Sequence, residues 1–167
     1  MRMPDYHFSW KDTIPSLLAG CFFIAQMIYG LFYTNTQQVS SIAYFGVAVF
    51  ILSGIFGMAP VIAFPKKGGV TKGKSFVHTT QVVDTGIYSI MRHPQYSSFM
   101  CWAIGASLLF QQWVVVVLGI PVIVLTYYDM TREDARNLQK FGDAYNLYMK
   151  KVPRVNFILG IIRRSMR

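Results

Sequence analysis

The run from Val39 to Phe64, VSSIAYFGVAVFILSGIFGMAPVIAF, contains no charged residue over 26 positions. A helix needs about 20 predominantly apolar residues to cross the hydrocarbon core of a bilayer, so this run is long enough to span a membrane. A second uncharged run extends from Thr13 to Tyr33, and a short polar turn at residues 34–38 separates the two. Residues 13–64 are therefore predicted to form a hairpin of two transmembrane helices, neither of which offers a polar anchor.

Two shorter apolar runs lie farther along the chain, at residues 95–110 and 113–128, separated by Gln111 and Gln112. Each is shorter than a comfortable span, so flanking residues must contribute or the bilayer must thin around the pair. Pro121 lies inside the second run and is expected to kink that helix, which membrane helices tolerate. The sequence thus predicts about four transmembrane helices.

Composition favours a membrane protein over the other broad classes. Of 167 residues 53% are hydrophobic and 14% are charged, against about 25% charged in an ordinary soluble domain. These values exclude a disordered tail, a collagen and a disulfide scaffold. Cys21 and Cys101 lie inside apolar runs and are expected to be packing residues, so no metal site is predicted. The predicted fold is all-α, a polytopic membrane helical bundle forming one membrane domain over residues 1–167.

Positive charge is concentrated in two parts of the chain. The net charge is +9, and 14 of the 16 Lys and Arg residues lie in residues 65–93 or after Asp129. The turns at 34–38 and 111–112 carry none. The positive-inside rule places both basic segments in the cytoplasm, and with four spans both termini are cytoplasmic. In so apolar a chain this charge favours an anionic leaflet, not nucleic acid, as the partner.

The chain after Asp129 has the pattern of an amphipathic helix. Thr131 with Asp134 three residues later resembles a capping box, which predicts a helix start at Thr131. Apolar side chains then recur at helical spacing, so the helix is expected to lie at the membrane interface. Gly142 is a candidate interruption of this helix, and Val152 and Pro153 should end it. The remaining basic tail, residues 156–167, is expected to hold leaflet anchors at Arg163, Arg164 and Arg167.

Ionisable residues at a membrane edge are expensive and are therefore functional candidates. One group is Arg92 with His93, where the polar loop meets the third apolar run; the other follows the fourth run at Asp129, Arg132, Glu133 and Asp134. A hairpin of the third and fourth spans returns both groups to the same membrane face. The stretch from Gly68 to Ser75 fits the letters of a phosphate-binding loop, but no strand precedes it, so a nucleotide site is not predicted.

The segment Val83–Tyr96, VDTGIYSIMRHPQY, resembles the signature V-x-x-G-x-Y-x-x-x-R-H-P-x-Y. It is found in the membrane methyltransferases that include isoprenylcysteine carboxyl methyltransferases and phospholipid N-methyltransferases. Glu133-Asp134, then FGDAYNLY at residues 141–148, then Val152-Pro153-Arg154 resemble the same family's E-E…F-G-x-x-Y-x-x-Y…V-P-R block. The resemblance covers about residues 80 to 155.

This resemblance implies S-adenosylmethionine as methyl donor, bound by a core at residues 65–155, and a lipid-like acceptor that enters from the bilayer. It implies catalytic roles for Arg92 and Glu133 and acceptor contacts for Arg92 and Arg132. Tyr145 and Tyr148 match family positions, although an interfacial aromatic belt is the other interpretation. The resemblance places these residues at the cofactor: Val82, Val83, Gly86, Tyr88, His93, Pro94, Gln95, Tyr96, Glu133 and Asp134.

The chemistry of the cofactor agrees with that assignment. A carboxylate such as Glu133 suits its ammonium, Arg92 or His93 suits its carboxylate, and tyrosine faces suit adenine and the cationic sulfur. The protein mainly aligns donor and acceptor and excludes water. A carboxylate or thiolate acceptor needs no base, whereas an amine must first lose a proton, with help from Glu133, Asp134 or His93.

Three positions depart from the family pattern. Ser98 stands where glycine is usual, Asp134 where a second glutamate is usual, and Asp129 where the prenylcysteine enzymes have an arginine that helps hold the substrate. The last departure weakens the prenylcysteine interpretation and leaves the acceptor open; a phospholipid amine is the first expectation, ahead of an isoprenylated carboxylate or a thiol. A nicotinamide-dependent reductase is a lesser alternative, and a non-catalytic lipid-binding bundle is the alternative of another class. The oligomeric state stays open.

Overall fold

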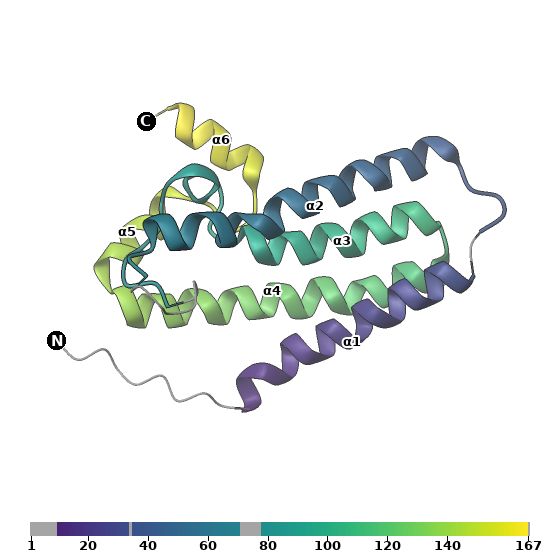
Figure 1. The fold of residues 1–167 in the computed structure, drawn as a ribbon, viewed down its shortest axis with the longest axis horizontal. Coiled ribbons are helices and arrows are strands. Elements are labelled where there is room, and N and C mark those ends of the chain that lie inside the picture. Colours follow the sequence, from purple (N-terminus) through teal and green to yellow (C-terminus); the bar gives the residue numbers. More distant parts are fainter. Residues whose placement is uncertain (1–9, 34, 71–77, 167) are drawn as a thin grey trace. The chain divides into compact units, whose positions relative to one another are not determined.

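The computed structural model describes residues 10–33, 35–70 and 78–166, and within these ranges the regular structure is helical (Figure 1). Most of the Gly68–Ser75 stretch, Thr34 and Arg167 lie outside the described residues. The predicted all-α class is confirmed. The helices are α1 (Trp10–Phe32), α2 (Ser40–Lys67), the 3₁₀ helix η1 (Gly86–Ser89), α3 (Pro94–Phe110), α4 (Trp113–Phe141), α5 (Asp143–Lys151) and α6 (Phe157–Ser165).

Within the described ranges, three helices are long and apolar enough to cross a membrane: Thr13–Phe32 within α1, and the whole of α2 and α4. Helix α3 has 17 residues, which is at the lower limit of the length that spans a bilayer. Only 17% of the most apolar window of α1 and of α2 is buried within the protein. The apolar side chains of these helices are therefore available to lipid, as expected of a membrane bundle.

The predicted helix start at Thr131 is wrong. Helix α4 runs without interruption from Trp113 to Phe141, and the Thr131 hydroxyl donates to the carbonyl of Tyr128 at 2.6 Å inside that helix. The break comes instead at Gly142, whose φ of 56° is favourable for glycine and costly for other residues. Helix α5 follows and ends before Val152, as predicted.

The chain divides into two compact units. The first, which we call the bundle unit, comprises the described parts of Asp5–Ile55 and Ser98–Thr131. Its core is formed by Ala106, Phe110 and Val115, with Met27 and Phe50 among the side chains packed against them.

Close helix contacts in the bundle unit depend on small residues. A Cβ at Gly46 would lie 2.8 Å from the backbone nitrogen of Leu109, so glycine allows α2 and α3 to approach. The buried hydroxyl of Ser53 donates to the carbonyl of Ser98 at 2.9 Å and lies 3.1 Å from its hydroxyl. Serine in place of the usual glycine at residue 98 is therefore compatible with tight packing.

The first two spans do hold polar anchors, contrary to the prediction. Gln26 of α1 is fully buried, and its amide donates to the carbonyls of Ala103 at 2.9 Å and Val115 at 3.0 Å. The hydroxyl of Ser16 donates to buried Asp129 at 2.5 Å. Hydrogen bonds between membrane helices stabilise a bundle by about 1 kcal/mol each. Gln26 and Ser16 therefore tie α1 to α3 and α4.

The second unit, which we call the site unit, comprises the described parts of Phe56–Ser97 and Arg132–Arg167. It contains the end of α2, the segment leading into α3, the end of α4, and helices α5 and α6. One core cluster joins Ala59, Val83 and Tyr88, and another joins Tyr145, Tyr148 and Val152 of α5 and its C-terminal end. Both signature blocks therefore lie within this unit.

Candidate active site

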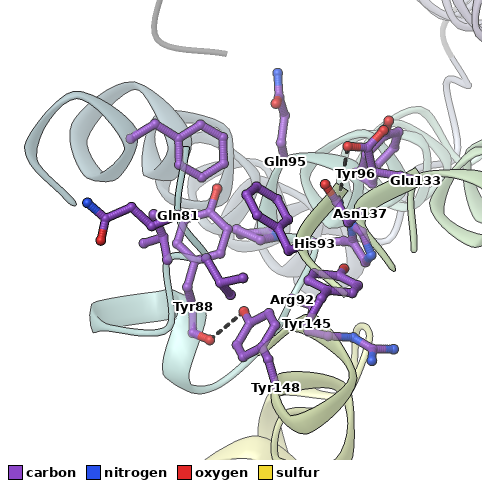
Figure 2. Close-up of a pocket in the computed structure, with 15 residues that line it drawn as sticks. Gln81, Tyr88, Arg92, His93, Gln95, Tyr96, Glu133, Asn137, Tyr145 and Tyr148 are labelled. Carbon is purple, nitrogen blue, oxygen red and sulfur yellow. Dashed lines mark hydrogen bonds between the residues drawn. The ribbon is translucent and has the colours of Figure 1, made fainter. Parts of the chain in front are cut away.

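The candidate site is a cavity of about 330 Å³ within the site unit (Figure 2). This volume falls in the range of small-molecule pockets, about 300–1,000 Å³. Its wall is formed by Phe64, Gln81, Val82, Val83, Tyr88, Arg92, His93, Pro94, Gln95, Tyr96, Glu133, Asn137, Phe141, Tyr145 and Tyr148. The Arg-His-Pro and Glu-Asp motifs, about 40 residues apart in sequence, thus meet at one cavity.

Nine of the twelve residues predicted for the site line this cavity, and Gly86, Arg132 and Asp134 do not. Tyr145 and Tyr148, at 4% and 6% exposed, face the cavity and are not part of an interfacial belt. The apolar side of the predicted interfacial helix is therefore directed into the site unit. The nine predicted residues on the wall are Val82, Val83, Tyr88, Arg92, His93, Pro94, Gln95, Tyr96 and Glu133.

Three lining residues, Phe64, Asn137 and Phe141, were given no role at the site by the sequence. Asn137 lies four residues after Glu133 on α4, so it shares the same helix face and helical spacing indicates its position. Phe64 is the last residue of an uncharged run, and no feature of the sequence distinguishes it from the lipid-facing side chains before it.

Asp134 is the centre of a buried hydrogen-bond cluster and is 3% exposed. Its Oδ1 accepts from His93 Nε2 and from the Tyr145 hydroxyl, both at 2.7 Å. Its Oδ2 accepts from Arg92 Nη2 at 3.1 Å and from Arg154 Nε at 2.8 Å. A carboxylate offers about four acceptor positions, so Asp134 is saturated by the protein. It orients its four partners and has no capacity left for the cofactor contact that was predicted.

The backbone holds the same residues in place. The amides of Arg92 and His93 donate to the carbonyls of Pro153 at 3.1 Å and Arg154 at 3.3 Å. The Tyr148 hydroxyl donates to the Tyr88 carbonyl at 2.7 Å (Figure 2). The Val-Pro-Arg segment therefore closes against the Arg-His-Pro segment, which explains why both blocks are needed to shape the cavity.

Glu133 remains partly exposed at the cavity, with 32% of its side chain accessible. Its carboxylate accepts from Arg136 and, at 3.2 Å, from Asn137 (Figure 2). Three of its roughly four acceptor positions are thereby used. One position on Oε1 remains for a cationic group that enters the cavity.

Arg92 lines the cavity and is 9% exposed. One of its terminal nitrogens binds Asp134, whereas Nε is buried without a hydrogen-bond partner among the described residues. A buried donor without a partner costs about 1–3 kcal/mol. The arrangement therefore suits an anionic group that would satisfy this donor.

Burial raises the pKa of Tyr88, Tyr145 and Tyr148 well above the usual tyrosine value. At Tyr145 the hydrogen bond to Asp134 raises the pKa further. All three hydroxyls therefore remain protonated at neutral pH, as the hydrogen bonds donated by Tyr145 and Tyr148 require.

These raised values predict a loss of stability in alkali. Tyrosines of the unfolded chain ionise near pH 10, while these three resist ionisation in the folded state. Their contribution to stability is complete below about pH 10 and decreases as the pH rises above it. Melting temperatures in detergent between pH 8 and 11 should show this decrease. In parallel, absorbance at 295 nm should show at least three of the ten tyrosines ionising only on unfolding. Ionisation of all ten in the folded protein would contradict the expectation.

An apolar helical chain with a cavity bearing an acid, an arginine and several aromatic rings has the features expected of a membrane methyltransferase. The comparisons with known proteins support this class. A family model described as phospholipid methyltransferase matches residues 41–144. The chain belongs to the phospholipid methyltransferase family, and the predicted family is confirmed.

Curated relatives are isoprenylcysteine O-methyltransferases. The chain is 27% identical over 165 residues to protein-S-isoprenylcysteine O-methyltransferase B of Arabidopsis thaliana, covering 88% of this chain and 79% of that protein. It is 34% identical over 94 residues to the enzyme of Schizosaccharomyces pombe, covering 50% and 39%. With the Homo sapiens enzyme it is 26% identical over 141 residues, covering 78% and 47%. The chain thus spans less than half the length of the last two. No solved structure matches.

These relatives are methyltransferases, so the predicted class of the chain, an integral-membrane methyltransferase, is confirmed. They do not confirm a phospholipid amine as the acceptor, because each is named for methylation at oxygen of an isoprenylcysteine.

Proposed function

We propose that this chain transfers a methyl group from S-adenosylmethionine to the carboxylate of an isoprenylated cysteine or a similar lipid-borne acid. The observation that carries the proposal is the meeting of Arg92, His93 and Glu133 at one cavity of about 330 Å³. The names of the curated relatives support a carboxylate acceptor.

The state of the two candidate bases also supports a carboxylate. The Nε2 of His93 is bound to Asp134, and the Glu133 carboxylate is bound to Arg136 and Asn137. An amine acceptor requires a group that removes a proton, whereas a carboxylate is already a nucleophile. Because both Glu133 oxygens already accept from protein donors and His93 donates through Nε2 to Asp134, the site suits a carboxylate acceptor better.

The lining residues fit S-adenosylmethionine. The open position on Glu133 would receive the ammonium, and the buried Nε of Arg92 would bind the carboxylate. Phe64, Phe141 and Tyr96 offer aromatic faces for the adenine and the sulfonium. The bound cofactor supplies a sulfonium methyl that moves by displacement, and the protein contributes alignment and exclusion of water.

The positive-inside rule supports a cytoplasmic position for the site unit and both termini. The last turn of α2 carries Lys66 and Lys67, and the last turn of α5 carries Lys150 and Lys151, so both helix ends are basic. Labelling of a cysteine placed at Lys150 by a membrane-impermeant maleimide tests this orientation. Modification only after the cells are opened agrees with it, whereas modification in intact cells contradicts it.

A phospholipid amine is the second candidate. The family description names phospholipids, and Asp129 stands where the resemblance to prenylcysteine enzymes implies arginine. An acidic residue does not favour an acidic acceptor.

The two acceptors are distinguished by giving vesicle-reconstituted protein and methyl-labelled cofactor an S-farnesylated N-acetylcysteine and, separately, phosphatidylethanolamine. Alkali releases the label from a methyl ester as volatile methanol but leaves an N-methyl group intact. Label released by alkali supports the carboxylate, and stable label in the phospholipid supports the amine.

Glu133→Gln is expected to weaken binding of S-adenosylhomocysteine about 10-fold, because a charged hydrogen bond to the ammonium becomes a neutral one. The melting temperature should change little, since the side chain is partly exposed and its partners Arg136 and Asn137 stay solvated. Calorimetric titration of the detergent-solubilised protein measures the affinity. The exposed acid Asp143 provides the control as Asp143→Asn, which should bind normally. Unchanged affinity in Glu133→Gln would remove this residue from the cofactor contacts.

A further inference from the structure

Helix α6 has an apolar face that no described part of the chain covers. Ile158, Ile161 and Ile162 are 60%, 51% and 48% exposed, and their spacing puts them on one side of the helix. An isolated exposed isoleucine is ordinary, but three on one face of a nine-residue helix form a surface that water solvates poorly.

The opposite side of α6 packs tightly against the site unit. Gly160 is buried, and a Cβ at this position would overlap the carbonyl oxygen of Ile90. The ring of Phe157 lies against that of Phe56, with centroids 6.3 Å apart. The helix is thus fixed to the segment that leads into Arg92.

Length and charge define the surroundings that α6 requires. Nine residues extend about 14 Å, too short to cross a hydrocarbon core of about 30 Å. The Asn156 side chain caps the helix by accepting from the Leu159 amide at 3.0 Å, so the helix begins at Phe157. Its last turn carries Arg163 and Arg164. A short helix with an apolar face and a basic end fits the interface of an anionic membrane leaflet.

We propose that α6 binds the anionic headgroup layer of the membrane that the chain itself spans, and that this contact holds the Arg92–His93 segment in its binding geometry. The lipid is the occupant because α1, α2 and α4 already place the chain in a bilayer. The two arginines complement anionic headgroups, and the isoleucines enter the acyl boundary.

Three contacts connect α6 to the site. Gly160 lies on the Ile90 carbonyl, two residues before Arg92. The segment that leads into α6 accepts the Arg92 and His93 amides at Pro153 and Arg154. Arg154 also donates to Asp134. Displacement of α6 from the membrane would therefore act on residues that line the cavity. This part of the inference rests on the proposed function, whereas membrane docking of α6 does not.

The docking is tested with the full chain in lipid nanodiscs, in a background in which Cys21 and Cys101 are replaced by alanine. A spin label is placed by Ile162→Cys on the apolar face or by Arg164→Cys beside Gly160. Its accessibility to dissolved oxygen and to a water-soluble nickel complex is compared. With phosphatidylglycerol present, the label at 162 should be protected from nickel and accessible to oxygen, and the label at 164 should show the reverse. If the label at 162 is as accessible to nickel as the label at 164, the proposal is overturned.

The coupling is tested by the affinity for S-adenosylhomocysteine. Replacing phosphatidylglycerol with phosphatidylcholine, or making the double change Arg163→Gln and Arg164→Gln, should weaken binding roughly 5-fold and raise nickel access at 162. The coupling is overturned if the affinity for S-adenosylhomocysteine is equal in phosphatidylglycerol and phosphatidylcholine while the label at 162 shows that α6 is docked in phosphatidylglycerol. If the unaltered protein in anionic nanodiscs binds no S-adenosylhomocysteine, the result counts against the proposed function and against the coupling. The spin-label measurement then decides by itself whether α6 docks on the membrane.

Discussion

Replacing Asp134 with alanine is expected to lower the melting temperature of the detergent-solubilised protein by about 10 °C and to eliminate measurable cofactor binding. Removing one partner of a buried ion pair costs about 3–5 kcal/mol, and 1 kcal/mol corresponds to roughly 2–4 °C in a chain of this size. Here Arg92, His93, Tyr145 and Arg154 lose a common acceptor at once. The two signature segments would then lose the side-chain cluster between them and keep the hydrogen bonds to the backbone carbonyls of Pro153, Arg154 and Tyr88.

One conservative variant separates charge from shape at this position, and a second variant at an exposed acid serves as the control. Asp134→Asn retains an acceptor for Tyr145 but presents an amide where Arg92 or Arg154 must donate, so its stability should lie between those of alanine and the native residue. Asp143→Asn, which changes an exposed acid on α5, should leave melting and binding unaltered. If Asp134→Ala melts within 2 °C of the unaltered protein, the cluster does not stabilise the site unit as we argue here.

The positions of the apolar helices along the chain could be predicted well, because uncharged runs of this length have few alternatives to a long helix. The start of the helix that follows the fourth span was predicted at the wrong residue. The switch from apolar to charged residues at Asp129 suggested a new helix, but nothing there breaks the backbone, and Thr131 continues the helix by bonding Tyr128. The break required a residue that tolerates positive φ, which Gly142 provides.

The meeting of the two signature segments could be predicted from topology, but the separate roles of Glu133 and Asp134 could not. Adjacent residues on a helix point about 100° apart, so one is directed to the cavity and the other into the buried cluster. Whether Glu133 or Asp134 enters the buried cluster depends on the positions of Arg154 and Tyr145. These positions follow from the turn at Gly142. Gln26 was missed for a similar reason, since its partners are backbone carbonyls of α3 and α4.

Replacing Arg92 with alanine is expected to weaken the binding of S-adenosylhomocysteine by about 10- to 100-fold, which corresponds to the 1.5–3 kcal/mol of a charged hydrogen bond. The melting temperature should fall less than in Asp134→Ala, because His93, Tyr145 and Arg154 continue to satisfy that carboxylate. Arg92→Lys keeps the charge but cannot supply the buried Nε donor, so its affinity should be intermediate. Lys150→Ala, a loss of an exposed positive charge on α5, should bind normally.

The double variant Arg92→Ala with Asp134→Asn distinguishes two roles for the arginine. If Arg92 only supports Asp134, the double variant should bind S-adenosylhomocysteine as weakly as Asp134→Asn alone, since the contact is already lost. If its unpartnered Nε also meets the carboxylate of the ligand, the double variant should bind several-fold more weakly than either single variant. We expect the second result, because that nitrogen is buried without a partner on a residue that lines the cavity. Equal affinity of the double variant and Asp134→Asn would make Arg92 a positioning residue only.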